Sequence, residues 1–547
     1  DLLNKLDPDN HLWFSLQKQR AIDETAEVFN SGDTKEREIR LNEINKAFDL
    51  GMNYPDYARK LFLIENCIYG IDIQQIAIQI SKLRFFISLI VDQKVDNNKP
   101  NRNILSMPNL ETKFVAANTL IGLEKPKQLS LIADEVKILE RDLLNIRHKI
   151  FFTRKYHSKK ELKEQDRAKR LKLQDALERS GYTKNTAAQL AGWNPFDPMK
   201  SAPYFDIETM FGITDGFDLV IGNPPYDVYQ GEKKNELEII KKLPIYELAK
   251  GGKLNAYKLF LSKSLELTES GLICLIFQNS FLGDLSAINI RKHYLQECAI
   301  KFISSFPERD DVNKRVFPGV KMSTCIMLAR KKAENKYMFN LDVYFDREFN
   351  KRASISYKSS EIPLIDPKYF TILSIDESEK ELIKDISKHK RLDSIGNCYE
   401  GEINLTFHKK FLTTNYSKSV FPMIKGAAVQ RYFIAKKMSQ GEVEWVDKDA
   451  FKRENSGPKS NHYLKRRLVM QGITGVDEKQ RLKMTILNPG SFCGNSVNYI
   501  LFNTDVKIEY LLALLNSSIL NWYFKKFSTN SNVNGYEVDN LPIVMNT

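Results

Sequence analysis

The sequence predicts an α/β protein with a doubly wound sheet, followed by an α+β domain. Residues 74–90 and 254–267 have the apolar spacing of helices. Apolar, β-branched runs with the length of buried strands lie before and after each of these segments. Those runs are residues 67–73, 114–117, 219–221 and 272–277. At 547 residues the chain is also too long for one hydrophobic core. We therefore expect a helical lead-in over residues 1–60, a first domain over 61–332 and a second over 333–547.

Composition and charge narrow the class of protein. A content of 42% hydrophobic and 28% charged residues is typical of a folded protein, and a formal charge of +13 favours a polyanionic partner. The six cysteines form no Cys-x-x-Cys pair and the seven histidines show no ligand spacing, so we expect reduced thiols, no metal site and a cytoplasmic location of the bacterial type. No apolar run approaches membrane-spanning length, which excludes a membrane partner.

Two polar residues follow predicted strands. Residues 1–60 are expected to be helical with a loop near residues 30–33, and the next run ends in Asp72. A carboxylate at the end of a strand in a doubly wound sheet can accept both hydroxyls of a ribose, although Asp also commonly caps a helix. Asn118 follows the run at 114–117, where an Asn is common for purely local reasons as well.

Residues 125–190 predict a charged helical hairpin inserted into the first domain. Leu139, Leu143, Ile146 and Ile150 supply its apolar stripe, and residues 154–172 are rich in Lys and Arg. The basic face could contact DNA phosphates, but a solvated helix face is the alternative. Glu161 and Lys163 have the spacing of a nuclease metal site, yet they lack a strand context and an upstream Asp, so we expect no nuclease here.

The segment 218–226 combines a short strand with a stiff polar loop. Gly222 ends the apolar run, and Pro224 and Pro225 restrict the backbone that follows. Open α/β sheets bind their ligands at the carboxyl ends of strands. The side-chain carbonyl of Asn223 and a proline backbone carbonyl can accept hydrogen bonds from an exocyclic amine, while Tyr226 can stack on its ring.

Asn223-Pro224-Pro225-Tyr226 resembles the motif of adenine-N6 DNA methyltransferases. With residues 193–196, 205–206 and 215–218 ahead of it, the segment is similar to the large methyltransferases of type IIG restriction–modification systems. The order of segments matches the γ class of that family. The resemblance implies a Rossmann-like methyltransferase sheet, S-adenosylmethionine as cofactor and double-stranded DNA with one flipped adenine as partner.

The resemblance also implies roles for individual residues. Asn223, Pro224, Pro225 and Tyr226 would form the catalytic loop. The implied cofactor-binding residues are Asp72 at the ribose, Ile73 beside it, Asn118 near the cofactor adenine, and Asn223. Phe317 precedes a predicted strand at 324–328 and matches the aromatic that packs on the flipped base opposite Tyr226. A buried core Phe is the alternative.

Residues 333–547 resemble the target-recognition domains of restriction–modification enzymes, chiefly over residues 422–433 and 510–543. Cations there would contact the duplex, since Lys and Arg on phosphates position a protein on DNA. The candidates are Lys425, Arg431, Lys465, Arg466 and Arg467. The sequence does not separate a base-reading residue from a phosphate contact.

One departure from the family pattern bears on function. The Gly-rich turn Asp-Pro-x-Cys-Gly-Ser-Gly is not found, and residues 2–10 resemble the segment that follows it in relatives. We therefore expect the parent protein to extend upstream with that turn and, in a type IIG enzyme, with a Mg-dependent nuclease. The alternatives are a phage-exclusion methyltransferase without nuclease and a DNA-binding module without catalysis. An RNA or protein methyltransferase is disfavoured by the recognition-like tail.

Overall fold

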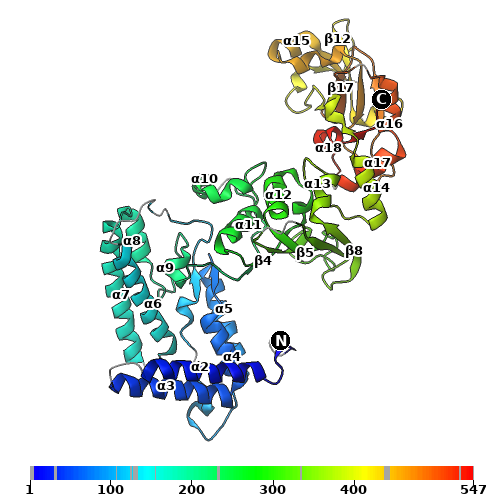
Figure 1. The fold of residues 1–547 in the computed structure, drawn as a ribbon. Coiled ribbons are helices and arrows are strands. Elements are labelled where there is room, and N and C mark those ends of the chain that lie inside the picture. Colours follow the sequence, from blue (N-terminus) through cyan, green and yellow to red (C-terminus); the bar gives the residue numbers. More distant parts are fainter. Residues whose placement is uncertain are drawn as a thin grey trace. The chain divides into compact units, whose positions relative to one another are not determined.

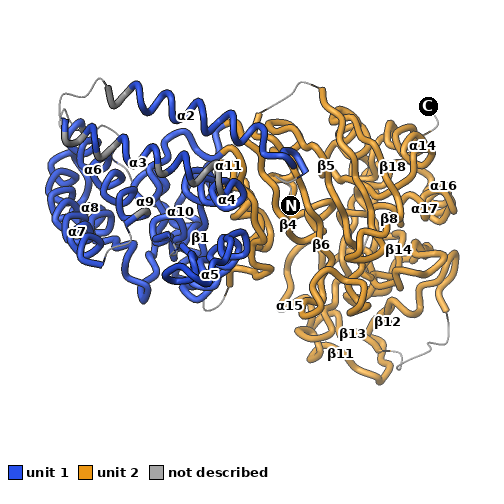
Figure 2. Tube along the Cα trace, turned by 90° about the horizontal axis from the view of Figure 1, so that it is seen from below, with its two compact units in different colours: residues 1–217, 232–245, 266–269 blue, residues 218–231, 246–265, 270–547 orange. Residues whose placement is uncertain are grey.

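A computed structural model describes most of the chain: residues 5–29, 34–105, 108–123, 126, 133–153, 156–230, 234–332, 336–435, 444–504, 506–528 and 531–545. The chain divides into two compact units, coloured in Figure 2. The first comprises residues 1–217, 232–245 and 266–269, and the second comprises residues 218–231, 246–265 and 270–547. The predicted domain over 61–332 contributes to both units, so its treatment as one domain stays a prediction. The expected loop at 30–33 and boundary at 333–335 lie outside the described residues.

In its described residues the first unit opens mainly with helices, as the charged lead-in predicts. They are α2 (His11–Phe29), α3 (Thr34–Asn53) and α4 (Pro55–Asn66). The side chain of Asp7 accepts the backbone N–H groups of Leu12 and Trp13 at 3.2 and 3.0 Å, which satisfies donors at the start of α2. Pro55 occupies the first turn of α4, where its missing N–H removes no helical bond.

A two-stranded parallel sheet follows. In it β1 (Gly70–Asp72) pairs with β2 (Phe114–Ala116), and α5 (Gln75–Ile90) lies between them in sequence. The helix was predicted from its apolar spacing, but its buried residues are Ile78 and Leu89. Four of the five residues that carried the spacing are between 51% and 63% exposed, namely Ile76, Ile80, Leu83 and Ile87, and the fifth, Ile90, is half-buried.

The predicted helical hairpin is present. It consists of α6 (Ala133–Phe152) and α7 (Tyr156–Arg179), and the predicted stripe Leu139, Leu143, Ile146 and Ile150 is buried. Asp166 of α7 pairs with Arg147 of α6 at 3.0 Å, and with Arg170 at 2.8 Å. These pairs satisfy charges that would be costly to bury alone. The unit also contains the shorter helices α8 (Lys184–Gly192), α9 (Ile207–Phe211) and α10 (Lys234–Lys242).

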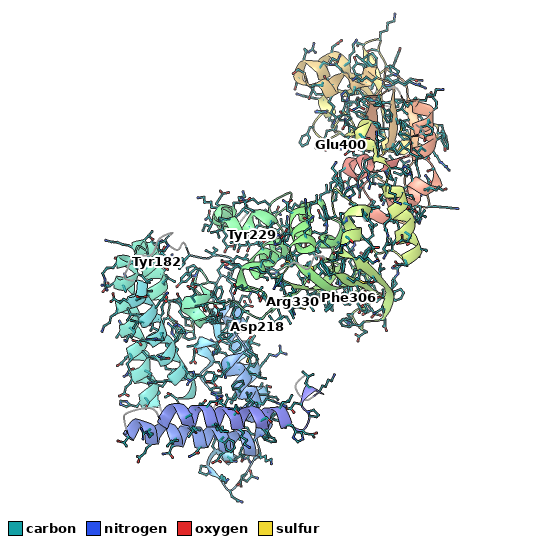
Figure 3. All side chains as sticks on the ribbon, in the orientation of Figure 1. Tyr182, Asp218, Tyr229, Phe306, Arg330 and Glu400 are labelled. Carbon is teal, nitrogen blue, oxygen red and sulfur yellow. The ribbon has the colours of Figure 1, made fainter. Side chains whose placement is uncertain are left out.

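The second unit contains a six-stranded mixed sheet in the order β3-β4-β6-β5-β7-β8. Figure 1 labels β4, β5 and β8 of this sheet. The strands are β3 (Leu219–Gly222), β4 (Leu272–Gln278), β5 (Ala299–Phe306), β6 (Thr324–Arg330), β7 (Met338–Tyr344) and β8 (Lys351–Lys358). The pairs β3–β4 and β5–β7 are parallel, and the others are antiparallel. Phe306 and Arg330, the last residues of β5 and β6, therefore mark opposite ends of the sheet (Figure 3). Helices α11 (Ala256–Leu267) and α12 (Ile288–Gln296) alternate with these strands.

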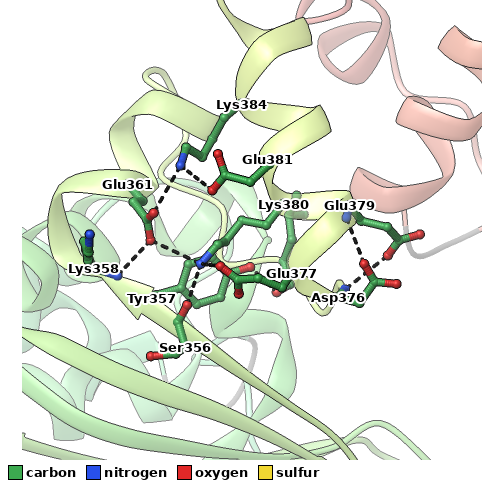
Figure 4. A network of polar contacts seen from close by, with 11 residues as sticks. Ser356, Tyr357, Lys358, Glu361, Asp376, Glu377, Glu379, Lys380, Glu381 and Lys384 are labelled. Carbon is green, nitrogen blue, oxygen red and sulfur yellow. Dashed lines mark hydrogen bonds and ion pairs between the residues drawn. The ribbon is translucent and has the colours of Figure 1, made fainter.

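A buried lysine ties the end of this sheet to the next helices, α13 (Ile362–Ile365) and α14 (Glu377–Ser387) (Figure 4). Lys380 of α14 donates to the Ser356 carbonyl on β8 at 2.7 Å. Its ammonium also pairs with Glu377 at 2.7 Å and Glu361 at 3.4 Å. The hydrogen bond and the two carboxylates offset the desolvation penalty of burying this lysine's charge.

The chain ends in an α+β region, as predicted. One antiparallel sheet has the order β10-β17-β14-β15, formed by Gly396–Glu400, Val497–Phe502, Arg467–Gln471 and Met484–Leu487. A second has the order β11-β13-β12-β16, formed by Leu412–Thr413, Trp445–Asp447, Val420–Ile424 and Phe492–Cys493. The helices are α15 (Lys448–Glu454), α16 (Ile508–Leu515), α17 (Ser518–Phe527) and α18 (Gly535–Asp539).

The last strand returns to the start of this region, because β18 (Pro542–Ile543) pairs with β9 (Lys390–Arg391). One apolar core continues from the six-stranded sheet through α14 to α16 and includes Ile273, Ile383 and Leu511. None of the helices in the described ranges has the length and apolarity that crossing a membrane requires.

Candidate active site

The loop Asn223–Tyr226 leaves the carboxyl end of β3, as its sequence predicts. Pro224 is buried, Tyr226 is half-buried, and Asn223 and Pro225 are exposed. Two contacts fix the loop's far end. The side-chain amide of Gln278, the last residue of β4, donates to the Tyr226 carbonyl at 3.1 Å. The N–H of Ala256, at the start of α11, donates to the Asp227 carbonyl at 2.9 Å.

Tyr226 meets Phe317, the residue proposed to lie opposite it. Their ring centroids are 5.7 Å apart at an interplanar angle of 65°, an edge-to-face contact. Phe317 lies between β5 and β6 in a turn that the Val320 N–H closes on the Phe317 carbonyl at 3.0 Å. The Tyr226 hydroxyl is buried without a hydrogen-bond partner among the described residues. Burial raises the pKa of this phenol, so it stays protonated at neutral pH.

Gln278 is a site residue that sequence reasoning missed. It is 7% exposed and sits beside Asn279, whose N–H donates to the Ser323 carbonyl at 3.1 Å, just before β6. The Asn279 side chain also accepts from the Ser305 hydroxyl at 2.9 Å. These bonds link the end of β4 to the loops carrying Tyr226 and Phe317. The sequence feature that could have identified Gln278 is its place as the polar residue directly after the apolar run Leu272–Phe277.

Asp72 and Asn118 lie at one edge of the two-stranded sheet in the first unit. Parallel pairing aligns Asp72 with Ala116, and the Ala117 N–H donates to the Asp72 carbonyl at 3.0 Å. Asp72 Oδ1 accepts the N–H of Gln74 at 2.7 Å, and Gln74 itself is the N-cap of α5. The Asn118 amide donates to Glu236 at 3.2 Å.

These residues suit the ribose and purine of a nucleoside cofactor. One carboxylate oxygen of Asp72 closes the local turn, which leaves its second oxygen to accept from hydroxyl groups. The adjoining Ile73 is 55% exposed and offers an apolar surface to a flat ring. In the part of the chain that is described, no group of three or more His, Cys, Asp or Glu side chains is arranged to hold a metal ion.

The proposed DNA-contacting cations have different surroundings. Lys465 is exposed, and the exposed Arg466 pairs with Glu509 at 2.7 Å. Lys425 is half-buried and pairs with Glu444 at 2.8 Å. These side chains lie at the surface, where a phosphate could replace or join the carboxylate partner.

Arg467 does not lie at the surface. Its guanidinium is fully buried, pairs with Glu402 at 2.5 Å and stacks 4.2 Å from the centroid of the Tyr499 ring. It also donates to the Ser491 carbonyl at 2.9 Å. Because burial and these partners engage the charge, Arg467 supports the domain core, which argues against the direct DNA contact proposed for it. In sequence it is indistinguishable from Lys465 and Arg466.

Comparison with protein families identifies two regions. Residues 66–312 match the Eco57I restriction–modification methylase model, and residues 421–543 match the TaqI-like C-terminal specificity domain. A relative from Methanocaldococcus jannaschii, named as a "putative type II restriction enzyme and methyltransferase", is 25% identical over 541 residues. That alignment covers 86% of this chain and 43% of the relative, so the chain spans less than half the relative's length.

Two solved structures are similar over most of the chain. The type IIL restriction–modification enzyme MmeI in complex with DNA is 11% identical with a TM-score of 0.41, over 92% of this chain and 64% of MmeI. The type IIG restriction endonuclease BpuSI is 10% identical with a TM-score of 0.28, over 94% of this chain and 76% of BpuSI. Because both TM-scores are low, the family assignment depends on the two family models and not on these structures. Residues 66–312 therefore belong to the Eco57I restriction–modification methylase family, and residues 421–543 form a TaqI-like specificity domain.

Proposed function

We propose that the chain transfers a methyl group from S-adenosylmethionine to N6 of adenine in double-stranded DNA. The observation that carries this proposal is the Asn223–Tyr226 loop at the end of β3, anchored by Gln278 and facing Phe317. A stiff loop with an amide and two aromatic rings suits a flat ring with an exocyclic amine. The methylase and specificity-domain assignments support the same reaction class.

The residues of the loop would orient the amine. The lone pair of an aromatic NH2 is delocalised into the ring, which makes the nitrogen a poor nucleophile. The side-chain carbonyl of Asn223 and the backbone carbonyl of Pro224 would accept its two N–H bonds and turn the lone pair out of the ring plane. Catalysis would then depend on positioning and on the arrangement of fixed dipoles. When bound, S-adenosylmethionine supplies an electrophilic methyl group.

The two aromatic residues would hold the target base. A base that leaves the helix loses stacking and pairing energy of a few kcal/mol, roughly, and aromatic contacts in the pocket offset part of that loss. Tyr226 and Phe317 come from different loops, so they can enclose a ring that enters between them. Asp72, Ile73 and Asn118 would hold the ribose and purine of the cofactor.

The specificity domain would position the duplex. Its exposed cations, among them Lys465 and Arg466, and the net charge of +13 support contact with phosphates. From the matches to a restriction–modification methylase and to a specificity domain, we propose that the protein belongs to a restriction–modification system. A methyltransferase of a phage-exclusion system is the alternative.

Transfer of labelled methyl from S-adenosylmethionine to unmethylated plasmid DNA tests the reaction. We expect label on adenine N6, lost in Asn223→Ala and retained in the exposed control Asn397→Ala on β10. Label on cytosine, or on RNA or protein in place of DNA, would refute the proposal. Salt-sensitive DNA binding without any label would indicate a recognition module without catalysis.

A further inference from the structure

A short hairpin in the specificity domain presents two aromatic side chains and a cation to solvent. Val429 and Ile434 form an antiparallel bridge, and the Ala435 N–H donates to the Ala428 carbonyl at 2.8 Å. Gln430 N–H donates to the Phe433 carbonyl at 2.9 Å. Arg431 and Tyr432 therefore lie at the turn, and we call Arg431–Phe433 the Tyr432 tip.

The side chains of the Tyr432 tip are exposed although two of them are large and aromatic. Tyr432 is 50% exposed and Phe433 is 59% exposed. The Arg431 guanidinium lies 5.1 Å from the centroid of the Tyr432 ring, a cation–π arrangement. Among the described residues no carboxylate forms an ion pair with Arg431, so its charge remains available to an anionic partner.

The backbone of the tip is held in an unfavourable conformation. Tyr432 has φ = 75°, in the left-handed region that favours Gly or Asn at turns. Its N–H donates to the Met484 carbonyl on β15 at 2.9 Å. Glycine would adopt this backbone without strain, so folding alone does not explain a tyrosine here. Residues kept in strained conformations cluster at ligand-binding sites.

A second element fixes the Arg431 side chain. Arg431 Nη2 donates to the Asn516 carbonyl, between α16 and α17, at 2.9 Å. Asn516 is fully buried, and its side-chain amide binds the Met484 backbone N–H and carbonyl at 3.0 and 2.9 Å. Met484 and Asn516 thus connect Arg431 and Tyr432 to the domain core. Such preorganisation lowers the entropic cost of binding a partner.

We propose that the Tyr432 tip inserts into a groove of the target duplex and contributes to sequence selection. Tyr432 and Phe433 would contact base edges or wedge against a base step, and Arg431 would bind a phosphate or the acceptor edge of a guanine. Aromatic and Arg residues also occur in protein interfaces, but an Arg on a specificity domain that pairs with no carboxylate in the described part of the chain favours a polyanion. The inference rests on the proposed function, since it assigns one contact of the same DNA.

Selection from a pool of duplexes with a randomised segment tests the tip in the 547-residue chain. The wild-type chain should enrich a sequence motif, and anisotropy with the enriched duplex then compares variants. Tyr432→Gly should melt at the same or a higher temperature yet bind at least about tenfold more weakly and select a less defined motif. Phe433→Ala should likewise bind the duplex more weakly and select a less defined motif. Arg431→Ala should reduce the slope of log K against log salt by about 1.

A second pair of an exposed aromatic ring and an arginine, Phe345 and Arg352 of the second unit, serves as the control. Phe345 is 54% exposed, and the exposed Arg352 guanidinium lies 5.7 Å from its ring centroid. Phe345→Ala and Arg352→Ala should leave the selected motif and the affinity unchanged.

The outcomes separate the tip from the proposed function. A wild-type chain that binds no duplex would refute the proposed function itself. A wild-type chain that enriches a motif, with tip variants that match it in affinity and motif, would overturn only the inference about the tip. Uniformly weaker binding with an unchanged motif would also overturn sequence selection by the tip.

Discussion

The rings of Tyr226 and Phe317 contact each other edge to face, with centroids 5.7 Å apart. A base stacked between two parallel rings needs about 7 Å, because stacked bases are separated by about 3.4 Å on each side. The two rings therefore occupy part of the space that a target base would take. If the base stacks between them, Phe317 or Tyr226 must turn or withdraw when it enters.

The first prediction concerns Phe317. We expect Phe317→Ala to lower kcat/KM for methyl transfer by about 10- to 100-fold, since stacking of a base on an aromatic contributes about 1–3 kcal/mol. Phe317→Tyr should retain most of the activity because it keeps the ring. Because the side chain is only half-buried, the melting temperature should change little. Steady-state methylation with both variants checks this, and equal activity of Phe317→Ala and wild type would exclude a stacking role.

The second prediction concerns Gln278. Gln278→Leu removes the donor to the Tyr226 carbonyl, so we expect the unfolding free energy to fall by about 1–3 kcal/mol. We also expect kcat to fall more than the affinity for DNA, because the loop loses its anchor while the DNA-contacting surface is unchanged. The exposed Gln296→Leu at the end of α12 is the control. Urea titration with DNA-binding and rate measurements checks both effects, and an unchanged kcat would show that the anchor is dispensable.

The third prediction concerns the buried pair Arg467–Glu402. Removing one partner leaves an uncompensated buried charge, so Arg467→Met should lower the unfolding free energy by about 3–5 kcal/mol. The double variant Arg467→Met with Glu402→Leu should recover much of that loss, because apolar side chains can replace a buried pair.

Denaturant titration of both variants measures the recovery. Among folded variants, the double variant should keep the salt dependence of DNA binding, while the exposed Lys465→Ala should reduce it. A reduced salt slope in the double variant would mean that Arg467 reaches a phosphate.

The fourth prediction concerns Glu65, which is 5% exposed beside a cavity of about 460 Å³ in the first unit. Burial, opposed by the nearby charges of Arg20 and Lys113, raises the pKa of its carboxyl from 4.5 to about 7. The folded state therefore binds more protons than the unfolded state between about pH 4.5 and 7. The contribution of Glu65 to stability is present below this window and is lost as the pH rises through it.

Replacing Glu65 with Gln removes the titration. We expect Glu65→Gln to unfold at a higher urea concentration than wild type at pH 8, and to show a smaller fall in stability between pH 5 and 8. Urea titrations of both proteins at the two pH values check this. An identical pH dependence in wild type and variant would show that Glu65 does not titrate in this range.

The strands and helices near the site could be predicted because their signals are local. Apolar runs preceded Asp72, Asn118 and Asn223, and the structure places strands at these runs. The stripe of α6 was also predicted correctly. Apolar spacing did not identify which residues of α5 are buried, since Ile76 and Ile80 are exposed while Ile78 is buried. Periodicity predicts that a helix forms but not which element covers each face.

By itself, the sequence determined the chemistry available to this protein: a stiff Asn-Pro-Pro-Tyr loop after a strand, a strand-end carboxylate and a net charge of +13. Only the tertiary structure decided which side chains meet. It placed Phe317 against Tyr226, 91 positions apart in sequence, and Gln278 on the Tyr226 carbonyl. It also buried Arg467 while leaving Lys465 and Arg466 exposed. The physical reason is that strand pairing and burial depend on contacts between distant segments, which residue type and local spacing do not encode.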